Sequence, residues 1–325
     1  MNKLVKLIIQ IPCFNEEKNL PDTLSSLPKE IAGVDIIETL VVDDGSSDNT
    51  AEIAKKIGTN HIVSLGRNRG LGYAFQSGLR HSLALGADIV VNTDGDNQYD
   101  ARDIPKLIAP ILSGKADFVI GCRPIRSHPE FSPLKKALQW FGSWILRRTS
   151  KTDVPDAASG FRAYSRETCL RLMVYSRFSH CMETLIQAGN AGLTVTWTDI
   201  RVNPSTRPSR LFKSIPQYLW KSGCTIFAMS TLYAPGRIFS WLASLFLLPA
   251  FLLGARFFYL TYFTPLDPER TYLPSLILLA VLGITGFLLL ALGLLGELLR
   301  THRRLSEEII YESKVLALNR KHPKN

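Results

Sequence analysis

The sequence has few cysteines, and their arrangement excludes the usual disulfide and zinc frameworks. The five are odd in number and form no CxxC pair: Cys13, Cys122, Cys169, Cys181 and Cys224. This usage is typical of ordinary residues in a reducing compartment. The chain also has no solenoid repeat and no low-complexity segment. Its first apolar run, Leu7 to Ile11, is short, meets Pro12 and precedes no small-residue cleavage site. We therefore interpret it as a first strand and not as a signal peptide.

Acidic residues are fewer than basic ones, with 28 Asp and Glu against 38 Lys and Arg and a net charge of +10. This balance favours a phosphate-rich partner or an anionic membrane surface without choosing between them. Nucleic acid would also suit the charge. However, no RNA- or DNA-binding motif appears, and much of the charge lies next to apolar C-terminal segments. We therefore expect no nucleic-acid partner.

Long apolar runs are missing from the chain before about residue 235, and two follow: Ile238 to Tyr262 and Leu273 to Leu295. Each exceeds the roughly 20 residues that cross a bilayer core, and the linker between them is short. Basic residues flank the outer ends of the pair: Arg237, Arg300, Arg303 and Arg304. The linker holds only Arg270, offset by two acids. The pattern predicts a multi-pass membrane hairpin with the N-terminal domain and both chain ends in the cytoplasm.

Strand-like and helix-like patterns alternate through the first part of the chain. Strands are predicted near residues 4–11, 36–42, 61–65, 89–91 and 118–121, and helices near 20–27, 51–57, 72–85 and 104–112. This alternation predicts an α/β fold with a mostly parallel sheet covered on both faces. Ligands of such sheets bind beyond the carboxyl ends of the strands.

Polar clusters follow three of the predicted strands: residues 15–17, Asp43 with Asp44, and Asp94 with Asp96. The last cluster also fits an ordinary turn rich in Asp and Gly. Three clusters at one sheet edge instead favour a nucleotide site beside a metal. The all-oxygen ligands there suit Mg²⁺ or Mn²⁺ better than Zn²⁺.

The Gly70-Leu71-Gly72 stretch opens a predicted helix and follows Arg67 and Arg69. Backbone and guanidinium donors at such a helix start can bind a phosphate. The stretch is not a dinucleotide fingerprint, because Phe75 stands where the third glycine belongs.

Several motifs resemble the signatures of family 2 glycosyltransferases of the GT-A fold. Three of them occur in order within about the first 125 residues: Pro12-Cys13-Phe14-Asn15-Glu16-Glu17, Val41 to Asp48, and Asp94-Gly95-Asp96-Asn97-Gln98. Two more stretches, Asp156 to Arg162 and Glu183 to Ala188, resemble the branch that makes polyprenyl-phosphate sugars. That branch contains dolichol-phosphate mannose synthases and bacterial undecaprenyl-phosphate glycosyltransferases. The resemblance implies a Rossmann-like GT-A domain and a location in the inner (cytoplasmic) membrane.

The resemblance also implies roles for single residues. Asp96 and Gln98 hold Mg²⁺ or Mn²⁺, and Asp94 lies next to the sugar-nucleotide as a further ligand. The base and ribose pocket is lined by Pro12, Asn15, Glu17 and Asp44, with Arg69 near a phosphate. For Asp43, a ligand role and a structural cap of the following turn remain open. Arg207 and Arg210 occupy the place of a family loop over the diphosphate, although the glycine of that loop is absent.

Other residues are candidates for handling the acceptor. Arg123 follows a predicted strand and, with Lys135, Lys136 and Arg162, is expected to hold an acceptor phosphate. Asp156 is a candidate base or orienting carboxylate, and a plain salt bridge between Asp156 and Arg162 is the alternative. Glu183 supports the site or is merely structural.

The predicted domains are residues 1–211 as the catalytic domain, 212–235 as a juxtamembrane interfacial helix, 236–299 as the membrane hairpin, and 300–325 as a charged cytoplasmic tail. Within the first, residues 133–149 carry Trp140 and Trp144 and fit an amphipathic helix in a membrane interface. An ordinary surface helix is the alternative for that segment.

The predicted function is inverting, metal-dependent transfer of a hexose from a nucleotide-sugar to polyprenyl (undecaprenyl) phosphate. UDP-glucose is the favoured donor and GDP-mannose the alternative. A polysaccharide synthase is disfavoured, because the chain has no Gln-x-x-Arg-Trp motif and only two spans. A non-catalytic membrane scaffold that binds a nucleotide-sugar is the rival of another class. The sequence leaves open whether the protein forms a homo-oligomer.

Overall fold

The computed structural model describes residues 4–124, 147, 150, 152–174, 176–177, 180–203, 223–224, 227–228, 231–264 and 271–321. Four predicted site residues and most of both predicted interfacial helices lie outside the described residues; the four are Lys135, Lys136, Arg207 and Arg210. The chain forms two compact units. One comprises Met1–Gly223 with Ile310–Asn325, and the other comprises Cys224–Ile309.

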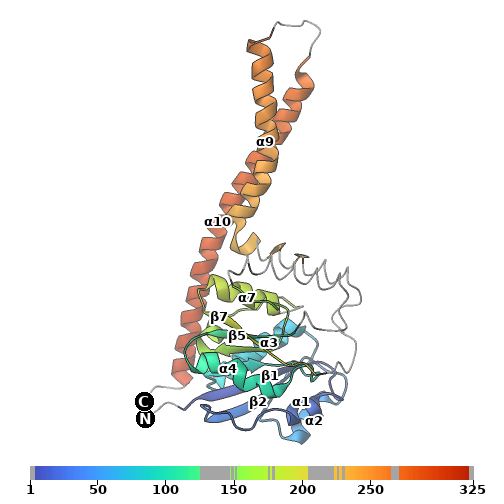
Figure 1. Ribbon diagram of the computed structural model, residues 1–325, viewed down its shortest axis with the longest axis vertical. Coiled ribbons are helices and arrows are strands. Elements are labelled where there is room, and N and C mark those ends of the chain that lie inside the picture. The colour runs from blue at the N-terminus through green and yellow to red at the C-terminus, as the bar shows by residue number, and fades with distance from the viewer. Residues whose placement is uncertain are drawn as a thin grey trace. The chain divides into compact units, whose positions relative to one another are not determined.

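A seven-stranded sheet is the centre of the first unit, with the strand order β3-β2-β1-β4-β6-β5-β7 (Figure 1). The strands are β1 Lys6–Cys13, β2 Ile36–Asp43, β3 His61–Ser64, β4 Ile89–Asn92, β5 Phe118–Cys122, β6 Arg162–Ser165 and β7 Val195–Asp199. Strand β6 runs antiparallel to both neighbours, and the other pairs are parallel. The predicted mostly parallel α/β sheet is confirmed, whereas β6 and β7 were not predicted.

Helices cover both faces of this sheet (Figure 1). They are α1 Leu20–Ser25, α2 Thr50–Ile57, α3 Leu71–Ala84, η1 Ala101–Asp103, α4 Ile104–Leu112, α6 Arg166–Arg171 and α7 Cys181–Asn190. Alternate residues of β1 serve the two faces: Leu7 and Ile9 pack with α1 and α4, whereas Gln10 faces Gly78 of α3. This period of two fixes the register, because a slip by one residue would turn the apolar side chains to the wrong face.

The second unit contains α9, Pro235–Tyr262, and the first part of α10, Leu273–Lys321. Both helices are long and apolar enough to cross a membrane, and 11% of each apolar window is buried. They approach through glycines of α10: a Cβ on Gly286 would lie 2.5 Å from Leu247, and one on Gly296 would lie 2.6 Å from Pro235. We call this pair, from Pro235 to Ile309, the helical hairpin.

The last turns of α10 belong to the first unit and pack against α6. The Tyr311 hydroxyl donates to Glu167 at 2.8 Å, and the Lys314 ammonium donates to the Leu170 carbonyl at 2.6 Å and the Leu172 carbonyl at 3.3 Å. Burial, with a contribution from Arg80, lowers the pKa of Lys314 to about 8. The predicted separate tail from residue 300 is thus a continuation of the second long helix, and its end serves as a C-terminal cap for α6.

Candidate active site

The polar loops predicted to meet at one sheet edge do so. Strands β1 and β2 pair in parallel register up to Cys13 and Asp43, and Asn92 at the end of β4 pairs with Gln10 of β1. The loops that follow these strands therefore leave from the same edge. This confirms the expected placement of the three clusters at the carboxyl ends of neighbouring strands.

The loops after β1 and β2 hold each other. The backbone N–H of Asn15 donates to the Ser46 hydroxyl at 2.9 Å, and the backbone N–H of Ser47 donates to the side-chain oxygen Oδ1 of Asn15 at 2.8 Å. The Asn49 N–H donates to Glu17 Oε2 at 3.2 Å. Asn15 has a positive φ of 56°, which asparagine tolerates better than most residues. Asn15 and Glu17 thus hold the loop after β1 to the loop after β2, and Pro12 lies buried in the last part of β1.

Asp43 and Asp44 are both buried, and each carboxylate accepts two hydrogen bonds from the protein. Asp43 accepts from the Ser46 N–H at 3.0 Å and the Ser64 hydroxyl at 3.2 Å, which supports the structural cap among its two alternatives. Asp44 accepts from the backbone N–H groups of Arg69 and Gly70 at 2.7 and 2.8 Å. Its carboxylate therefore fixes the entry to α3.

Three of the backbone N–H groups at the start of α3, where a phosphate was expected, are engaged within the protein. The Gly72 N–H donates to the Arg177 carbonyl at 3.4 Å, and a Cβ on Gly72 would lie 1.8 Å from the Ser176 carbonyl oxygen. Chain from residues 176–177 thus lies against this helix N-terminus, so the Gly72 N–H is not available to a phosphate and the Arg69 guanidinium remains the candidate. The Arg69 guanidinium lies over the Tyr73 ring at 4.7 Å and donates to its hydroxyl at 2.6 Å.

The loop after β4 brings together the three expected metal ligands, Asp94, Asp96 and Gln98, all of them half-buried. Asp96 Oδ1 accepts from the Gln98 N–H at 3.2 Å, so the motif forms a tight turn. A Cβ on Gly95 would lie 2.9 Å from Cys13 Sγ. The close approach explains the glycine between the two carboxylates.

The electrostatics of this loop suit a divalent cation. Burial and the neighbouring Asp96 charge raise the pKa of Asp94 to about 7. A cation between the two carboxylates would relieve this repulsion. Within the described part of the chain, no three His, Cys, Asp or Glu side chains converge on one point. Two carboxylates with an amide oxygen match Mg²⁺, which takes one or two carboxylates plus substrate phosphates.

Arg123 and Asp156 form a buried ion pair next to this loop. Arg123 Nε lies 2.7 Å from Asp156 Oδ2, and Nη2 lies 3.1 Å from Oδ1. Burial alone would lower the pKa of Arg123, but the Asp156 carboxylate raises it, so the guanidinium stays charged. The charges of Arg123 and Asp94 also influence each other. Among the described residues, Asp156 engages Nε and Nη2 and leaves Nη1 for another ligand.

A second loop holds Asp94 from the other side. Gly160 lies directly against its carboxylate, since a Cβ there would meet both oxygens at 3.1 Å. Gly160 itself is fixed by two buried side chains: its N–H donates to the Tyr99 hydroxyl at 2.9 Å, and its carbonyl accepts from Asn92 Nδ2 at 2.9 Å. Sequence reasoning missed Asn92 and Tyr99. An amide in an otherwise apolar strand is the signal that marks Asn92.

The family model of glycosyl transferase family 2 matches residues 8–172, slightly more than half of the chain. The chain belongs to glycosyl transferase family 2. It is 32% identical over 216 residues to a UDP-N-acetylglucosamine–dolichyl-phosphate N-acetylglucosaminyltransferase of Methanococcus voltae, covering 60% of this chain and 83% of the relative. It is 31% identical over 170 residues to an undecaprenyl-phosphate mannosyltransferase of Micrococcus luteus, covering 50% and 68%.

Solved structures agree on the fold. Glucosyl-3-phosphoglycerate synthase from Mycobacterium tuberculosis, in complex with Mn²⁺, UDP and phosphoglyceric acid, superposes with a TM-score of 0.54 at 20% identity, covering 70% of this chain and 78% of that one. Mannosyl-3-phosphoglycerate synthase from Rubrobacter xylanophilus gives 0.54 at 16% identity, with 70% and 74% covered. The GT-A-like mixed sheet is therefore shared.

Arg162 of this glycosyltransferase does not face an acceptor. Its side chain is fully buried, and its nitrogens donate to the carbonyls of Ala157, Ser159 and Cys181 at 2.7–2.8 Å and to the Thr184 hydroxyl at 2.9 Å. Each of the three nitrogens already donates within the protein, and the side chain is closed off from solvent. The predicted acceptor role for Arg162 is wrong, and so is the alternative salt bridge with Asp156, which pairs with Arg123 instead. Arg162 ties the Asp156 loop to α7.

Two buried residues at the start of α7 complete this side of the glycosyltransferase. The His180 ring stacks on Phe75 with centroids 4.0 Å apart. Burial and the Arg162 charge lower the pKa of His180 to about 3, so it is neutral. Glu183 accepts from the Ser176 N–H at 3.0 Å, which supports its structural alternative. Sequence reasoning missed His180.

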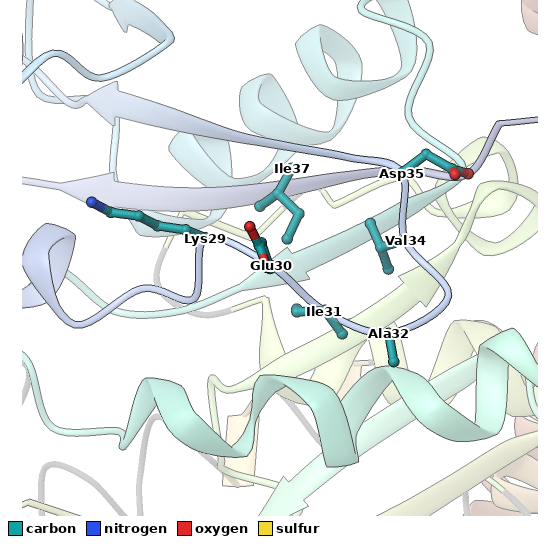
Figure 2. A pocket seen from close by; sticks show the side chains of 7 residues that line it. All are labelled: Lys29, Glu30, Ile31, Ala32, Val34, Asp35 and Ile37. Atoms are coloured by element: carbon teal, nitrogen blue, oxygen red, sulfur yellow. The ribbon is translucent and has the colours of Figure 1, made fainter.

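A surface pocket lies at the other edge of the sheet, around the start of β2 (Figure 2). Figure 2 shows that its lining lies on the loop that enters β2 and at the beginning of that strand. The residues are Lys29, Glu30, Ile31, Ala32, Val34, Asp35 and Ile37. Since Ile36 pairs with Lys6 at the beginning of β1, this edge carries the amino ends of the strands. The pocket is separate from the acidic loops.

Proposed function

We propose that this enzyme transfers a hexose, with inversion, from a nucleotide-sugar to polyprenyl phosphate at the cytoplasmic face of a membrane. The observation that carries the proposal is the buried Arg123–Asp156 pair, which presents a fixed cation beside the Asp94–Asp96 loop. One side of the site thus attracts a cation and with it a nucleoside diphosphate. The other attracts a phosphate acceptor. The relatives from Methanococcus and Micrococcus are named for dolichyl- and undecaprenyl-phosphate acceptors.

On the donor side, Asp96 and Gln98 would hold Mg²⁺ or Mn²⁺, with Asp94 next to the sugar. The ion, when bound, supplies positive charge against the departing diphosphate. Asn15, Glu17 and Asp44 would bound the base and ribose pocket, with Asp43 as the cap of its turn. Arg69, Arg207 and Arg210 are proposed on the diphosphate side. The all-oxygen donor set and the repulsion between two close carboxylates support this assignment.

On the acceptor side, Nη1 of Arg123 would bind the lipid phosphate, with Lys135 and Lys136 as further proposed contacts. A phosphate monoester has a second pKa near 6, so the acceptor is largely a dianion at neutral pH and needs no strong base. Asp156 then orients Arg123 and is not the base, because its carboxylate already accepts two bonds from the guanidinium. Direct attack on the anomeric carbon gives inversion.

The helical hairpin is proposed to cross the cytoplasmic membrane, which would place the active site near a lipid acceptor. Its outer ends carry Arg237, Arg300 and Arg303, which favours a cytoplasmic location for the catalytic unit and both chain ends. The predicted interfacial segments at 133–149 and 212–235 would add contacts with the bilayer surface.

The test is incubation of membranes containing the full-length protein with labelled UDP-glucose, GDP-mannose or UDP-N-acetylglucosamine, followed by chromatography of the lipid extract. We expect an acid-labile lipid product, with UDP-glucose the favoured donor, and a configuration opposite to that of the donor. A retained configuration would contradict direct attack. Membranes that contain the Asp96→Ala variant serve as the control, because they report the lipid product formed by other glycosyltransferases.

The rival scaffold function is separated by the nucleotide product. A non-catalytic nucleotide-sugar binder would release no nucleoside diphosphate in the presence of polyprenyl phosphate. We expect release that depends on both the lipid and the metal. Binding of the nucleotide-sugar without release of nucleoside diphosphate would contradict the enzymatic function and support the scaffold.

A further inference from the structure

The metal-binding loop is clasped by a segment about a hundred residues further along the chain. Tyr99 and Val202 form an antiparallel bridge. The Asn203 N–H donates to the Gln98 carbonyl at 2.8 Å, and the Asp100 N–H donates to the Arg201 carbonyl at 3.3 Å. We call these contacts, between residues 97–100 and 201–203, the clasp.

The Asn203 side chain reaches the residue between the two strongest ligand candidates. Its Nδ2 donates to the Asn97 carbonyl at 2.9 Å and lies 3.5 Å from Asn97 Oδ1. One asparagine thus binds two successive backbone carbonyls, that of Asn97 through its side chain and that of Gln98 through its own N–H.

Asn97 is where the loop requires such support. Its φ is +56°, in the left-handed region, which asparagine tolerates better than most residues but which is still less favourable than the right-handed region. A conformation of this kind persists only where its surroundings fix it. Asn97 lies between Asp96 and Gln98, so its backbone angles set the direction of one proposed ligand relative to the other. A relaxed φ would move the Gln98 amide away from the Asp96 carboxylate.

The base of the clasp is rigid. The Arg201 guanidinium lies 2.7 Å from Asp103 Oδ1, and the backbone N–H of Arg201 donates to Asp103 Oδ2 at 2.7 Å. Asp103 is fully buried. Arg201 also lies 3.4 Å from the Asp100 carboxylate. Because both ends of Val202 are held, Asn203 is a fixed donor and not a mobile loop side chain.

We propose that Asn203 is a positioning residue for the metal site: it holds Asn97 in its left-handed conformation and so keeps Asp96 and Gln98 convergent on one cation. The proposal rests on the proposed metal-dependent function. It assigns to Asn203 no contact with the metal or the substrates.

The test compares Asn203→Ala and Asn203→Leu with the wild-type full-length protein in detergent. The leucine variant keeps the approximate size of the side chain and removes its polar amide. Asn190→Ala is the matched control, because Asn190 Nδ2 donates to the Ile186 carbonyl at the same 2.9 Å but at the far end of α7. Free Mn²⁺ is measured by electron paramagnetic resonance during titration, with UDP and in parallel with GDP.

Removal of a residue that orients metal ligands typically weakens metal binding by about 10- to 100-fold. We expect at least a tenfold rise (~10×) in the Mn²⁺ dissociation constant for both Asn203 variants, no change for Asn190→Ala, and recovery of the turnover rate when Mn²⁺ is raised in proportion. A general loss of folding would lower the rate without such recovery and would overturn the proposal. Unchanged Mn²⁺ affinity in either Asn203 variant would also overturn it.

Failure of the proposed function has a different signature. If the wild-type protein binds Mn²⁺ but forms no lipid-linked sugar, the proposed acceptor is wrong, and weakened Mn²⁺ binding in the Asn203 variants still supports the clasp. If the wild-type protein forms the product and binds no Mn²⁺ with either nucleotide, the metal role fails and the clasp proposal fails with it.

Discussion

In the catalytic unit, strand residues such as Leu7, Ile9 and Val91 are fully buried, whereas in the helical hairpin Phe251 and Phe287 expose 73% and 69% of their surface. The first unit removes its apolar side chains from water by itself. The hairpin leaves them outside, where water would be unfavourable at about 25 cal/mol per Å². The apolar side chains of the first unit are covered by its own residues, whereas those of the hairpin helices are left exposed, which supports the proposed membrane span.

Polar groups show the same contrast. In the catalytic unit, buried charges such as Arg162 and Asp103 are held by several hydrogen bonds each, because a buried charge without partners is costly. In the hairpin, the described apolar windows carry few charges, and apart from Arg256 the described acidic and basic side chains lie at the start of α9 or from Glu297 onward in α10. Four changes distinguish the units, from the largest expected effect to the smallest.

Asp96→Ala should remove transfer without affecting the hairpin. Loss of one preorganised electrostatic contact typically costs 10²–10³ in rate, and loss of a metal ligand at the diphosphate should reach about a thousandfold, or about 4 kcal/mol. Product formation is measured in membranes at fixed protein amount. Asp22→Ala, on exposed α1, is the control. Near-normal turnover of Asp96→Ala would remove the proposed metal role.

Ile284→Arg should impair membrane insertion while leaving the catalytic unit folded. Ile284 is 62% exposed in the middle of the apolar part of α10. An arginine at the centre of a span costs about 3 kcal/mol. Insertion is measured with an acceptor site for glycosylation placed in the linker between the two helices, with Ile284→Leu as control. Equal insertion of both variants would argue against a membrane span here.

Arg162→Met should lower the stability of the catalytic unit and not act on the acceptor specifically. It leaves buried carbonyl oxygens of Ala157, Ser159 and Cys181 without their donor, which should cost about 3 kcal/mol. Thermal unfolding of the solubilised full-length protein measures the loss. Arg102→Met, at a guanidinium that is 74% exposed, should cost less. Normal melting combined with a raised acceptor KM would restore the acceptor-phosphate role to Arg162.

Lys314→Met tests the point where α10 enters the catalytic unit. The folded pKa of Lys314, about 8, lies below its ordinary value of 10.5. Between these values the unfolded chain binds more protons, so the contribution of Lys314 to folding stability increases as pH rises from about 8 toward 10.5. Partial exposure limits this contribution to about 1 kcal/mol or less. The melting temperatures of wild type and variant are compared at pH 7.5 and 9.5. A melting-temperature difference, wild type minus variant, that decreases from pH 7.5 to pH 9.5 would contradict a buried ammonium with a lowered pKa.

Much of the fold was predictable because its signals are local. The apolar runs of β1, β2 and β4, the capping residues after them and the two long apolar segments are all short-range patterns. The same patterns missed β6, whose four residues contain Arg162. An arginine is expected to be exposed when only its neighbours in sequence are known. Its carbonyl partners come from the loop before it and from α7, and only the folded chain brings these together.

The sequence by itself determined which residue types gather at the active edge, since a parallel sheet places every strand's carboxyl end on one side. The positions of Asp43, Asp44, Asp94 and Asp96 directly after predicted strands were enough to assign them to the same edge. Which of these groups is already occupied was decided only in three dimensions. Asp44 accepts hydrogen bonds from the backbone N–H groups of Arg69 and Gly70, and Asp156 accepts from the Arg123 guanidinium. At the start of α3, the Gly72 N–H donates to the Arg177 carbonyl. The physical reason is that hydrogen-bond capacity is limited. Whether a side chain is free for a ligand depends on donors and acceptors that lie far away in the sequence.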